Sequence, residues 1–257
     1  MSTDNINKED LFEYLISEFR QVKNKSMKHK DYSILIDLYN FIAIDLHGPI
    51  LAEFEDKREK IAYSLLYQRY LDISRLFVWV IFCVYSGAYR SAIRELRFIL
   101  ESFILSYYLD KEYPNLTVWE KMGADIPETD WEKIGVDKLY GRKLIIEKAR
   151  LNEEIYHLFK RLSKYVHSST EELWDLLEWM ENEGMVRTSF DYDENLFEKC
   201  IEFSIEVIDS LIFVLIQAFP KVRSSLKEII MQKDYARRLI ERSRLSLCAK
   251  IVLSNTA

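Results

Sequence analysis

Glycine and proline are scarce in this chain, whose 257 residues include 6 glycines and 4 prolines. Average proteins use about 7% glycine and about 5% proline, which supply the turns that sheets need. Their scarcity argues against a sheet protein and favours long helices. Because 49% of the residues are hydrophobic, the chain can bury a sizeable core. We expect an all-α protein, a multi-helix bundle of long antiparallel helices.

Cysteine and histidine are few as well. The three cysteines, Cys83, Cys200 and Cys248, are scattered through helical patterns, which excludes a disulfide framework and a thiolate metal site. The four histidines are spread along the chain and lack the spacing of a zinc site. We therefore expect no metal and no other cofactor. A reducing, cytoplasmic location fits this use of cysteine.

Several catalytic motifs are missing. The chain has no glycine-rich phosphate loop, no His-Glu-x-x-His and no Gly-x-Ser-x-Gly, which excludes the common nucleotide-binding, zinc-protease and serine-hydrolase patterns. The acidic group Asp191, Asp193 and Glu194 lacks the glycine of a calcium loop. We interpret that group as the cap of a helix.

Long hydrophobic runs are also absent. The most apolar stretches, Leu76–Tyr85 and Leu211–Phe219, are about ten residues each, whereas a membrane span needs about 20. We expect both to be core helices and expect no membrane partner. The polar stretch Met1–Asp10 has no apolar core of the kind that export requires, which also fits a cytoplasmic protein.

The charge is unevenly distributed. The formal net charge is −6, but residues 221–257 hold nine Lys or Arg against three acidic residues. This tail therefore carries +6 and the rest of the chain −12. Such asymmetry predicts that the tail contacts an acidic protein partner, the acidic body of its own fold, or nucleic acid.

Hydrophobic periodicity places the helices in order. The first helix starts near Lys8 and frays in Lys23–Lys30. Further helices are expected over Tyr32–Leu46, about Glu53 to Tyr85, Gly87 to about Asp110, Arg142–Val166 and Ser169–Asn182. Another is capped by Asp191 or Asp193 and stops at Pro220, and the basic tail forms the last. We expect Gly48 to take a left-handed cap before Pro49, and Leu71–Tyr85 to be the central buried helix. An irregular insertion occupies residues 111–141.

These segments suggest three parts packed as one unit. Residues 1–50 form N-terminal helices, residues 51–220 a helical core, and residues 221–257 a basic C-terminal helix.

The helix after Gly87 carries a charged stripe. Arg90, Arg94, Arg97 and Glu101 fall within an arc of roughly 60° on an ideal helix, between apolar residues on both sides. Three guanidiniums repel one another unless an anion lies among them, and Glu101 neutralises only one. Either acidic residues of a neighbouring helix or second subunit supply the rest, or a phosphate-bearing ligand does.

A second pattern is Arg161 followed six positions later by His167, where a helix is expected to end. Histidine transfers protons near neutral pH, and arginine holds a phosphate as charge develops. Together they suffice for metal-free RNA cleavage, in which the 2′-hydroxyl attacks its own phosphate. An ideal helix separates the two side chains by about 120°, so convergence requires unwinding at Val166 or a second protomer. The alternative is a structural histidine at a helix end.

The Arg161-to-His167 pattern resembles the HEPN superfamily (higher-eukaryote and prokaryote nucleotide-binding helical proteins), whose mark is an arginine, four to six residues, then a histidine. The resemblance covers at most Ala62–Met180 and is to the uncharacterised branches. It implies a helical bundle that dimerises with the motif at the interface. It also implies metal-independent endoribonuclease activity and a role in phage defence or in a toxin–antitoxin pair.

On this resemblance Arg161 contacts phosphate and His167 is the general acid or base. The phosphate-binding residues would be Arg90, Arg94, Arg97 and Lys164, and the orienting residues Glu101 and Tyr165. The partner would be RNA or a nucleotide, with a homo-oligomer or a protein partner of the basic tail in addition. The alternative is a non-catalytic helical interaction protein whose Arg/Glu stripe is structural or a dimer interface.

Overall fold

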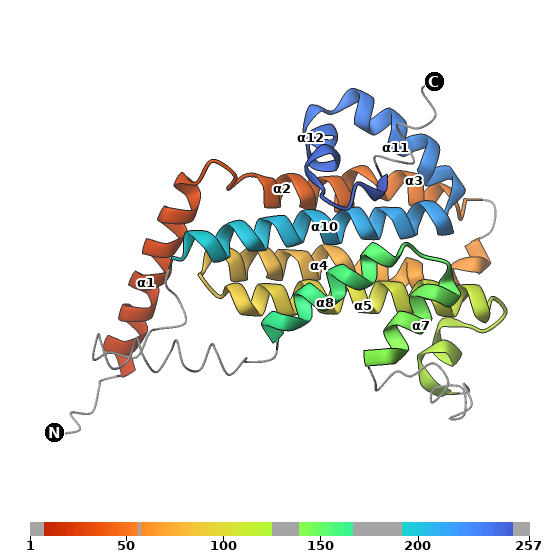
Figure 1. Ribbon diagram of the computed structural model, residues 1–257, viewed down its shortest axis with the longest axis horizontal. Coiled ribbons are helices and arrows are strands. Elements are labelled where there is room, and N and C mark those ends of the chain that lie inside the picture. The colour runs from red at the N-terminus through yellow and green to blue at the C-terminus, as the bar shows by residue number, and fades with distance from the viewer. Residues whose placement is uncertain (1–7, 56–57, 125–138, 167–191, 249–257) are drawn as a thin grey trace.

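The computed structural model describes residues 8–55, 58–124, 139–166 and 192–248, which form helices and no strand (Figure 1). The α-helices are α1 (Lys8–Lys28), α2 (Ile34–Tyr39), α3 (His47–Ala52), α4 (Leu65–Tyr85), α5 (Tyr89–Glu112), α7 (Leu139–Ala149), α8 (Glu153–Val166), α10 (Glu194–Ala218), α11 (Pro220–Gln232) and α12 (Asp234–Arg242). In addition, η1 (Asn40–Asp45) and η3 (Glu120–Ala124) are π-helices and η2 (Arg58–Tyr63) is a 3₁₀-helix. The prediction of an all-α bundle is confirmed.

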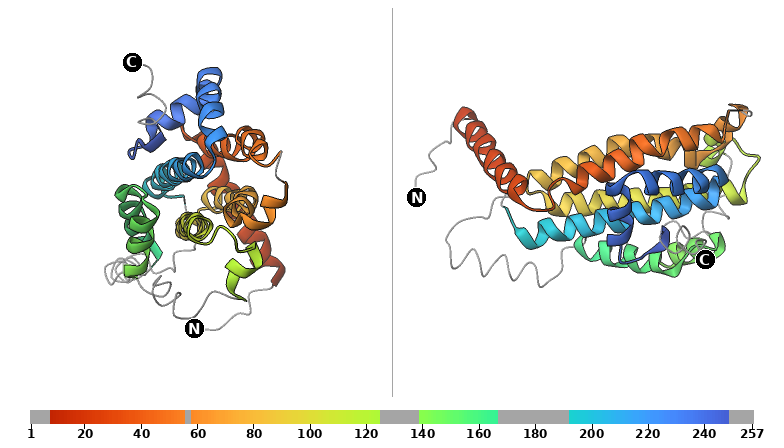
Figure 2. Two further views of the ribbon diagram at one scale, coloured as in Figure 1. Left: turned by 90° about the vertical axis from the view of Figure 1, so that its right-hand side faces the viewer. Right: turned by 90° about the horizontal axis from the view of Figure 1, so that it is seen from above.

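The bundle is built around α5. Helix α4 packs antiparallel to α5, α10 lies along both, and α7 and α8 cover the other side of α5 (Figures 1 and 2). Helices α2 and α3 run alongside α10, above it in Figure 1, and α11 and α12 lie over them. Helix α1 projects from one end of the bundle.

The hairpin between α4 and α5 turns at Gly87, as predicted. Gly87 has φ +81°, a left-handed conformation that an L-residue with a Cβ adopts only at a cost. The amide of Ala88 donates to the carbonyl of Cys83 at 2.8 Å, which satisfies one of the last carbonyls of α4. The glycine therefore sets the sharp reversal that places α5 against α4.

The prediction that Leu71–Tyr85 is the central buried helix is wrong. Val78, Trp79 and Phe82 on α4 are each about half exposed. Helix α10 is the more buried element, because every residue from Phe203 to Leu211 is buried. An apolar run has the same sequence pattern whether a helix is covered on one face or on all faces. In this bundle α5 and α10 occupy the centre.

The predicted helix Tyr32–Leu46 continues instead to Ala52 through the π-turn η1. Pro49 lies in the first turn of α3, where its missing N–H would have no intrahelical partner. Gly48 does not have the predicted left-handed conformation. Proline here is a helix start, whereas the sequence reading took it as a stop.

Residues 34–52 are apolar and long enough to span a membrane, alone among the described segments. Core helices of soluble proteins can be equally long and apolar, so one such stretch is weak evidence for a membrane span. Of this stretch 33% is buried in the bundle, including Leu35, Phe41 and Ile42.

Other helix boundaries also differ from the predictions. Helix α1 continues to Lys28, because Val22 and Ser26 are buried and anchor its second half. Helix α4 begins at Leu65, after the separate turn η2, rather than near Glu53. The predicted helix Arg142–Val166 is two helices, α7 and α8, separated at Arg150, whose φ is +57°.

Helix α10 is capped by Asp193, one of the two residues that the sequence left open, and it ends before Pro220 as predicted. The side chain of Asp193 accepts a hydrogen bond from the amide of Leu196 at 3.0 Å, which caps the helix. Helix α10 ends at Ala218, and Pro220 begins α11. The predicted helix Ser169–Asn182 and His167 lie outside the described residues, as does much of the predicted insertion at 111–141.

The basic tail contacts the acidic body of the same chain. Ion pairs join the tail to acidic residues of earlier helices: Lys233 to Asp45, Arg242 to Asp31 at 2.9 Å, and Arg244 to Glu202 at 2.6 Å. Tyr235 also donates to Asp45. One of the three alternatives from the sequence, docking on the chain's own acidic body, is therefore observed.

Candidate functional site

The stripe on α5 is partly covered by α8. Arg90 and Arg94 are exposed, whereas Arg97 and Glu101 are half-buried. The guanidinium carbon of Arg97 lies 4.8 Å from the centre of the Phe159 ring, which is buried in α8. This cation–π contact fixes the middle of the stripe against α8 and leaves its N-terminal half exposed.

Helices α5 and α8 run antiparallel, so the N-terminal half of α5 lies beside the C-terminal half of α8 (Figures 1 and 2). Starting from the Arg97–Phe159 contact, Arg94 and Arg90 follow in the direction in which α8 approaches Val166. Arg90, Arg94 and Arg161 therefore lie toward the same end of the bundle, but on different flanks of α8, because Phe159 and Arg161 are only two residues apart on that helix.

Arg161 is held by a carboxylate of α10. Its Nη2 and Nη1 donate to Glu206 Oε2 at 2.5 Å and Oε1 at 3.3 Å. The Glu206 side chain is 2% exposed and that of Arg161 is 38% exposed. Burial raises the pKa of Glu206, and the charge of Arg161 opposes that rise. The guanidinium is thus fixed from the protein side and open on the other.

Aromatic rings surround this ion pair. The Arg161 guanidinium lies 5.7 Å from the centre of the Phe203 ring, and Tyr165 meets Phe203 edge to face with centres 5.6 Å apart. The Lys199 ammonium lies 5.6 Å from the centre of the Tyr165 ring. Its hydrogen bond to Tyr165 raises the pKa of Lys199, and Lys164 is exposed nearby on α8.

Sequence reasoning missed Lys199, Phe203 and Glu206. They follow one another at intervals of four and three on α10, which places them on one helix face. The sequence shows this spacing. It does not show which residue of another helix pairs with a charged residue inside a strongly apolar helix. His167 lies outside the described residues, so its distance from Arg161 stays a prediction.

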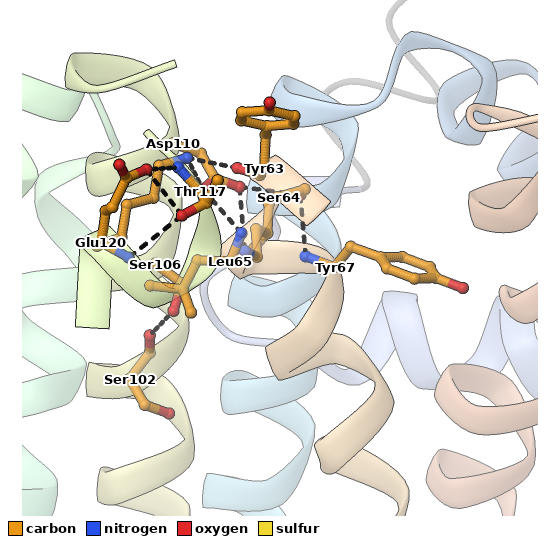
Figure 3. Close-up of polar contacts among 11 residues, drawn as sticks. Tyr63, Ser64, Leu65, Tyr67, Ser102, Ser106, Asp110, Thr117 and Glu120 are labelled. Carbon is orange, nitrogen blue, oxygen red and sulfur yellow. Dashed lines mark hydrogen bonds and ion pairs between the residues drawn. The ribbon is translucent and has the colours of Figure 1, made fainter. Parts of the chain in front are cut away.

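A second polar cluster joins η2, α4, α5 and η3 (Figure 3). The carboxylate of Asp110 accepts from Ser64 Oγ at 2.9 Å and from the amides of Leu65 at 2.9 Å and Leu66 at 3.0 Å. Lys121, whose side chain is fully buried, donates to Asp110 at 2.8 Å. The carboxylate thus caps the N-terminus of α4 from the end of α5.

This Asp110 cluster is structural. Lys121 also donates to the carbonyl of Tyr63 at 2.5 Å, so its donors serve backbone and carboxylate groups of the fold. The three bonds to Ser64 and the first α4 amides occupy both Asp110 oxygens. The cluster therefore fastens the open end of the α4–α5 hairpin.

A buried histidine joins the α1–α2 connection to α10. The amide of Asp31 donates to His29 Nδ1 at 3.2 Å, so the proton of the neutral ring is on Nε2. That nitrogen faces Glu198 Oε1 at 3.4 Å, and the ring meets Phe197 edge to face. These contacts fasten the base of α1, at a distance in sequence from the Arg161 cluster.

Metal and thiol chemistry find no support in the described part of the chain. Among residues 8–55, 58–124, 139–166 and 192–248, no group of three His, Cys, Asp or Glu side chains is placed to hold a metal ion. The three cysteines are free and buried. Burial raises the pKa of Cys83 to about 11, which keeps it a protonated, unreactive thiol.

Comparisons of the chain with protein-family models, with curated proteins and with solved structures find no match.

Proposed function

We propose that this chain is a HEPN-like helical protein that binds RNA at the C-terminal half of α8 and cleaves it without a metal. The observation that supports this proposal is the surface around Arg161. A guanidinium fixed by a buried carboxylate lies there among exposed cations and an aromatic ring. Basic grooves with aromatic platforms are typical of single-stranded nucleic-acid sites.

Each group has a role in this proposal. The guanidinium donors of Arg161 that do not face Glu206 bind a phosphate, and Tyr165 stacks on a base. Arg90, Arg94 and Lys164 neutralise neighbouring phosphates. The 2′-hydroxyl attacks the adjacent phosphorus and the bond to the 5′-oxygen breaks. His167 takes the proton from the 2′-hydroxyl or gives one to the leaving 5′-oxygen. The products are a 2′,3′-cyclic phosphate and a 5′-hydroxyl.

The test uses a fluorescent single-stranded oligoribonucleotide in the presence of EDTA. We expect cleavage by the wild type, and a loss of at least about 100-fold in His167→Ala with binding retained. Arg161→Ala is made in a Glu206→Gln background, so that no buried carboxylate is left without its partner. It should bind more weakly than Glu206→Gln alone. Lys148→Ala, an exposed cation on α7, is the matched control.

Two results would contradict the proposal. Equal cleavage by wild type and His167→Ala would rule out the proposed catalysis by His167. Binding that falls as much in Lys148→Ala as in the Arg161 variant would show general charge attraction without a site at α8.

A second candidate is a non-catalytic helical interaction protein in which the charged residues are structural. The observation that favours it is that Arg97 and Arg161 both find partners, Phe159 and Glu206, within their own chain. Under this candidate the wild type neither binds nor cleaves the oligoribonucleotide, so the same experiment separates the two.

A further inference from the structure

Helix α10 carries a row of three acidic residues, Glu202, Glu206 and Asp209. Their spacing of four and three places them on one face. Each carboxylate binds side chains or amides of another segment of the chain. Glu206 binds Arg161 of α8, Glu202 binds Arg244 after α12 at 2.6 Å, and Asp209 binds the segment Ser243–Cys248. The candidate site and the C-terminal segment thus share one row of carboxylates.

Asp209 anchors the C-terminal segment firmly. Its carboxylate, 3% exposed, accepts from Ser243 Oγ at 2.6 Å and from the amides of Leu247 and Cys248 at 3.0 Å each. The thiol of Cys248 donates to the backbone carbonyl of Asp209 at 3.3 Å. Without these donors a buried carboxylate would be strongly unfavourable. The bonds therefore hold the segment on α10.

Docking of the segment brings a second guanidinium to the row. Arg244 pairs with Glu202. Burial raises the pKa of the adjacent Glu206, and the charge of Arg244 is among the influences that oppose this rise. With the segment docked, Glu206 pairs with Arg161, Glu202 pairs with Arg244, and Asp209 binds donors of the segment. If the segment leaves, Glu202 loses the charge of Arg244 and Asp209 loses its donors, so the potential along the row beside Arg161 becomes more negative. An anion near Arg161 is then repelled.

We propose that Ser243–Cys248 is a latch that controls anion binding at Arg161: docked on the acidic row it permits phosphate to bind, and undocked it prevents binding. This inference depends on the proposed function, since it concerns the same guanidinium. It adds a means of regulation, because any partner that binds Ser243–Cys248 away from α10 would turn the site off.

The experiment measures binding of a fluorescent single-stranded oligoribonucleotide to the full chain at one salt concentration. Arg244→Ala should weaken binding about three- to tenfold. Adding Glu202→Gln should restore it, because the extra carboxylate is then gone. The matched control is Arg237→Ala, which removes an exposed tail arginine paired only to Asp234 among the described contacts. It should change binding less than twofold.

A second measurement follows docking directly. Asp209→Asn replaces an acceptor by an amide that cannot accept all three bonds, so hydrogen exchange at the amides of Leu247 and Cys248 should accelerate at least tenfold. Unchanged exchange would overturn the latch. Faster exchange without weaker binding, or no rescue by Glu202→Gln, would overturn its control of Arg161.

Failure of the proposed function would give a different set of results from failure of the latch. If neither wild type nor any variant binds the oligoribonucleotide while exchange in Asp209→Asn accelerates, the segment docks but regulates no phosphate site at Arg161. Both the proposed function and the control would then be rejected, and docking alone would remain.

Discussion

The Arg161–Glu206 pair stabilises the fold, and in the proposed function its guanidinium also binds phosphate. A buried carboxylate is costly to the fold, and a bidentate guanidinium offsets that cost. Because Arg161 is 38% exposed, it is also the one member of the pair that a ligand can reach. Under the proposed function, replacing Arg161 changes both stability and phosphate binding, and the two effects can be separated by pH and by a compensating substitution.

Arg161→Ala should lower the free energy of unfolding by about 2–3 kcal/mol at pH 7.5, because Glu206 is left buried and charged. Burial holds the folded pKa of Glu206 above its ordinary 4.5, so the folded state binds this proton more tightly than the unfolded state. The contribution of Glu206 to the free energy of unfolding therefore falls as pH rises from 4.5 through the folded pKa. The loss in Arg161→Ala should therefore be smaller at pH 5.0, which urea denaturation at both pH values measures.

The control for this prediction is Arg161→Ala with Glu206→Gln, which should recover most of the lost stability at pH 7.5. A loss of equal size at both pH values would mean that the arginine stabilises through packing on Phe203 instead.

At the scale of elements, the α4–α5 hairpin is fastened at both ends by different means. Gly87 permits the reversal at one end, and Asp110 with Lys121 joins the other (Figure 3). These contacts hold α5 in place against α8, where Arg97 of the stripe packs on Phe159.

Gly87→Ala should destabilise the protein by about 1–2 kcal/mol, since its φ of +81° places a Cβ against the following carbonyl. Gly48→Ala is the matched control. Gly48 lies in α3, and an added Cβ meets no atom within 4 Å. It should be neutral or stabilising by up to about 1 kcal/mol. Thermal melts of the two variants check the contrast, and equal effects would contradict the role of the turn.

At the scale of the whole molecule, the basic tail and the acidic body attract each other within one chain. The pair of Lys233 with Asp45 is the most buried of these contacts, because the Asp45 side chain is 4% exposed. The charge asymmetry read from the sequence therefore appears as intramolecular docking of α11 and α12.

Lys233→Ala combined with Arg242→Ala should lower Tm by roughly 4–8 °C, because two acidic residues of the body lose their cations. The difference should shrink at 1 M NaCl as screening weakens the wild-type pairs. Arg223→Ala with Lys227→Ala removes the same charge from exposed positions of α11 and should change Tm by less than about 2 °C. Equal losses in the two variants would show that net charge, not pairing, matters.

The sequence by itself determined the helical class, the Gly87 hairpin and the boundaries of α10, since these follow from local periodicity, glycine geometry and capping. It did not reveal the exposure of Trp79 or the helix start at Pro49, because both depend on which neighbours cover a face. Only the tertiary structure decided that Glu206 meets Arg161, 45 residues away along the chain. Pairing between distant helices depends on packing, and local sequence carries no record of it.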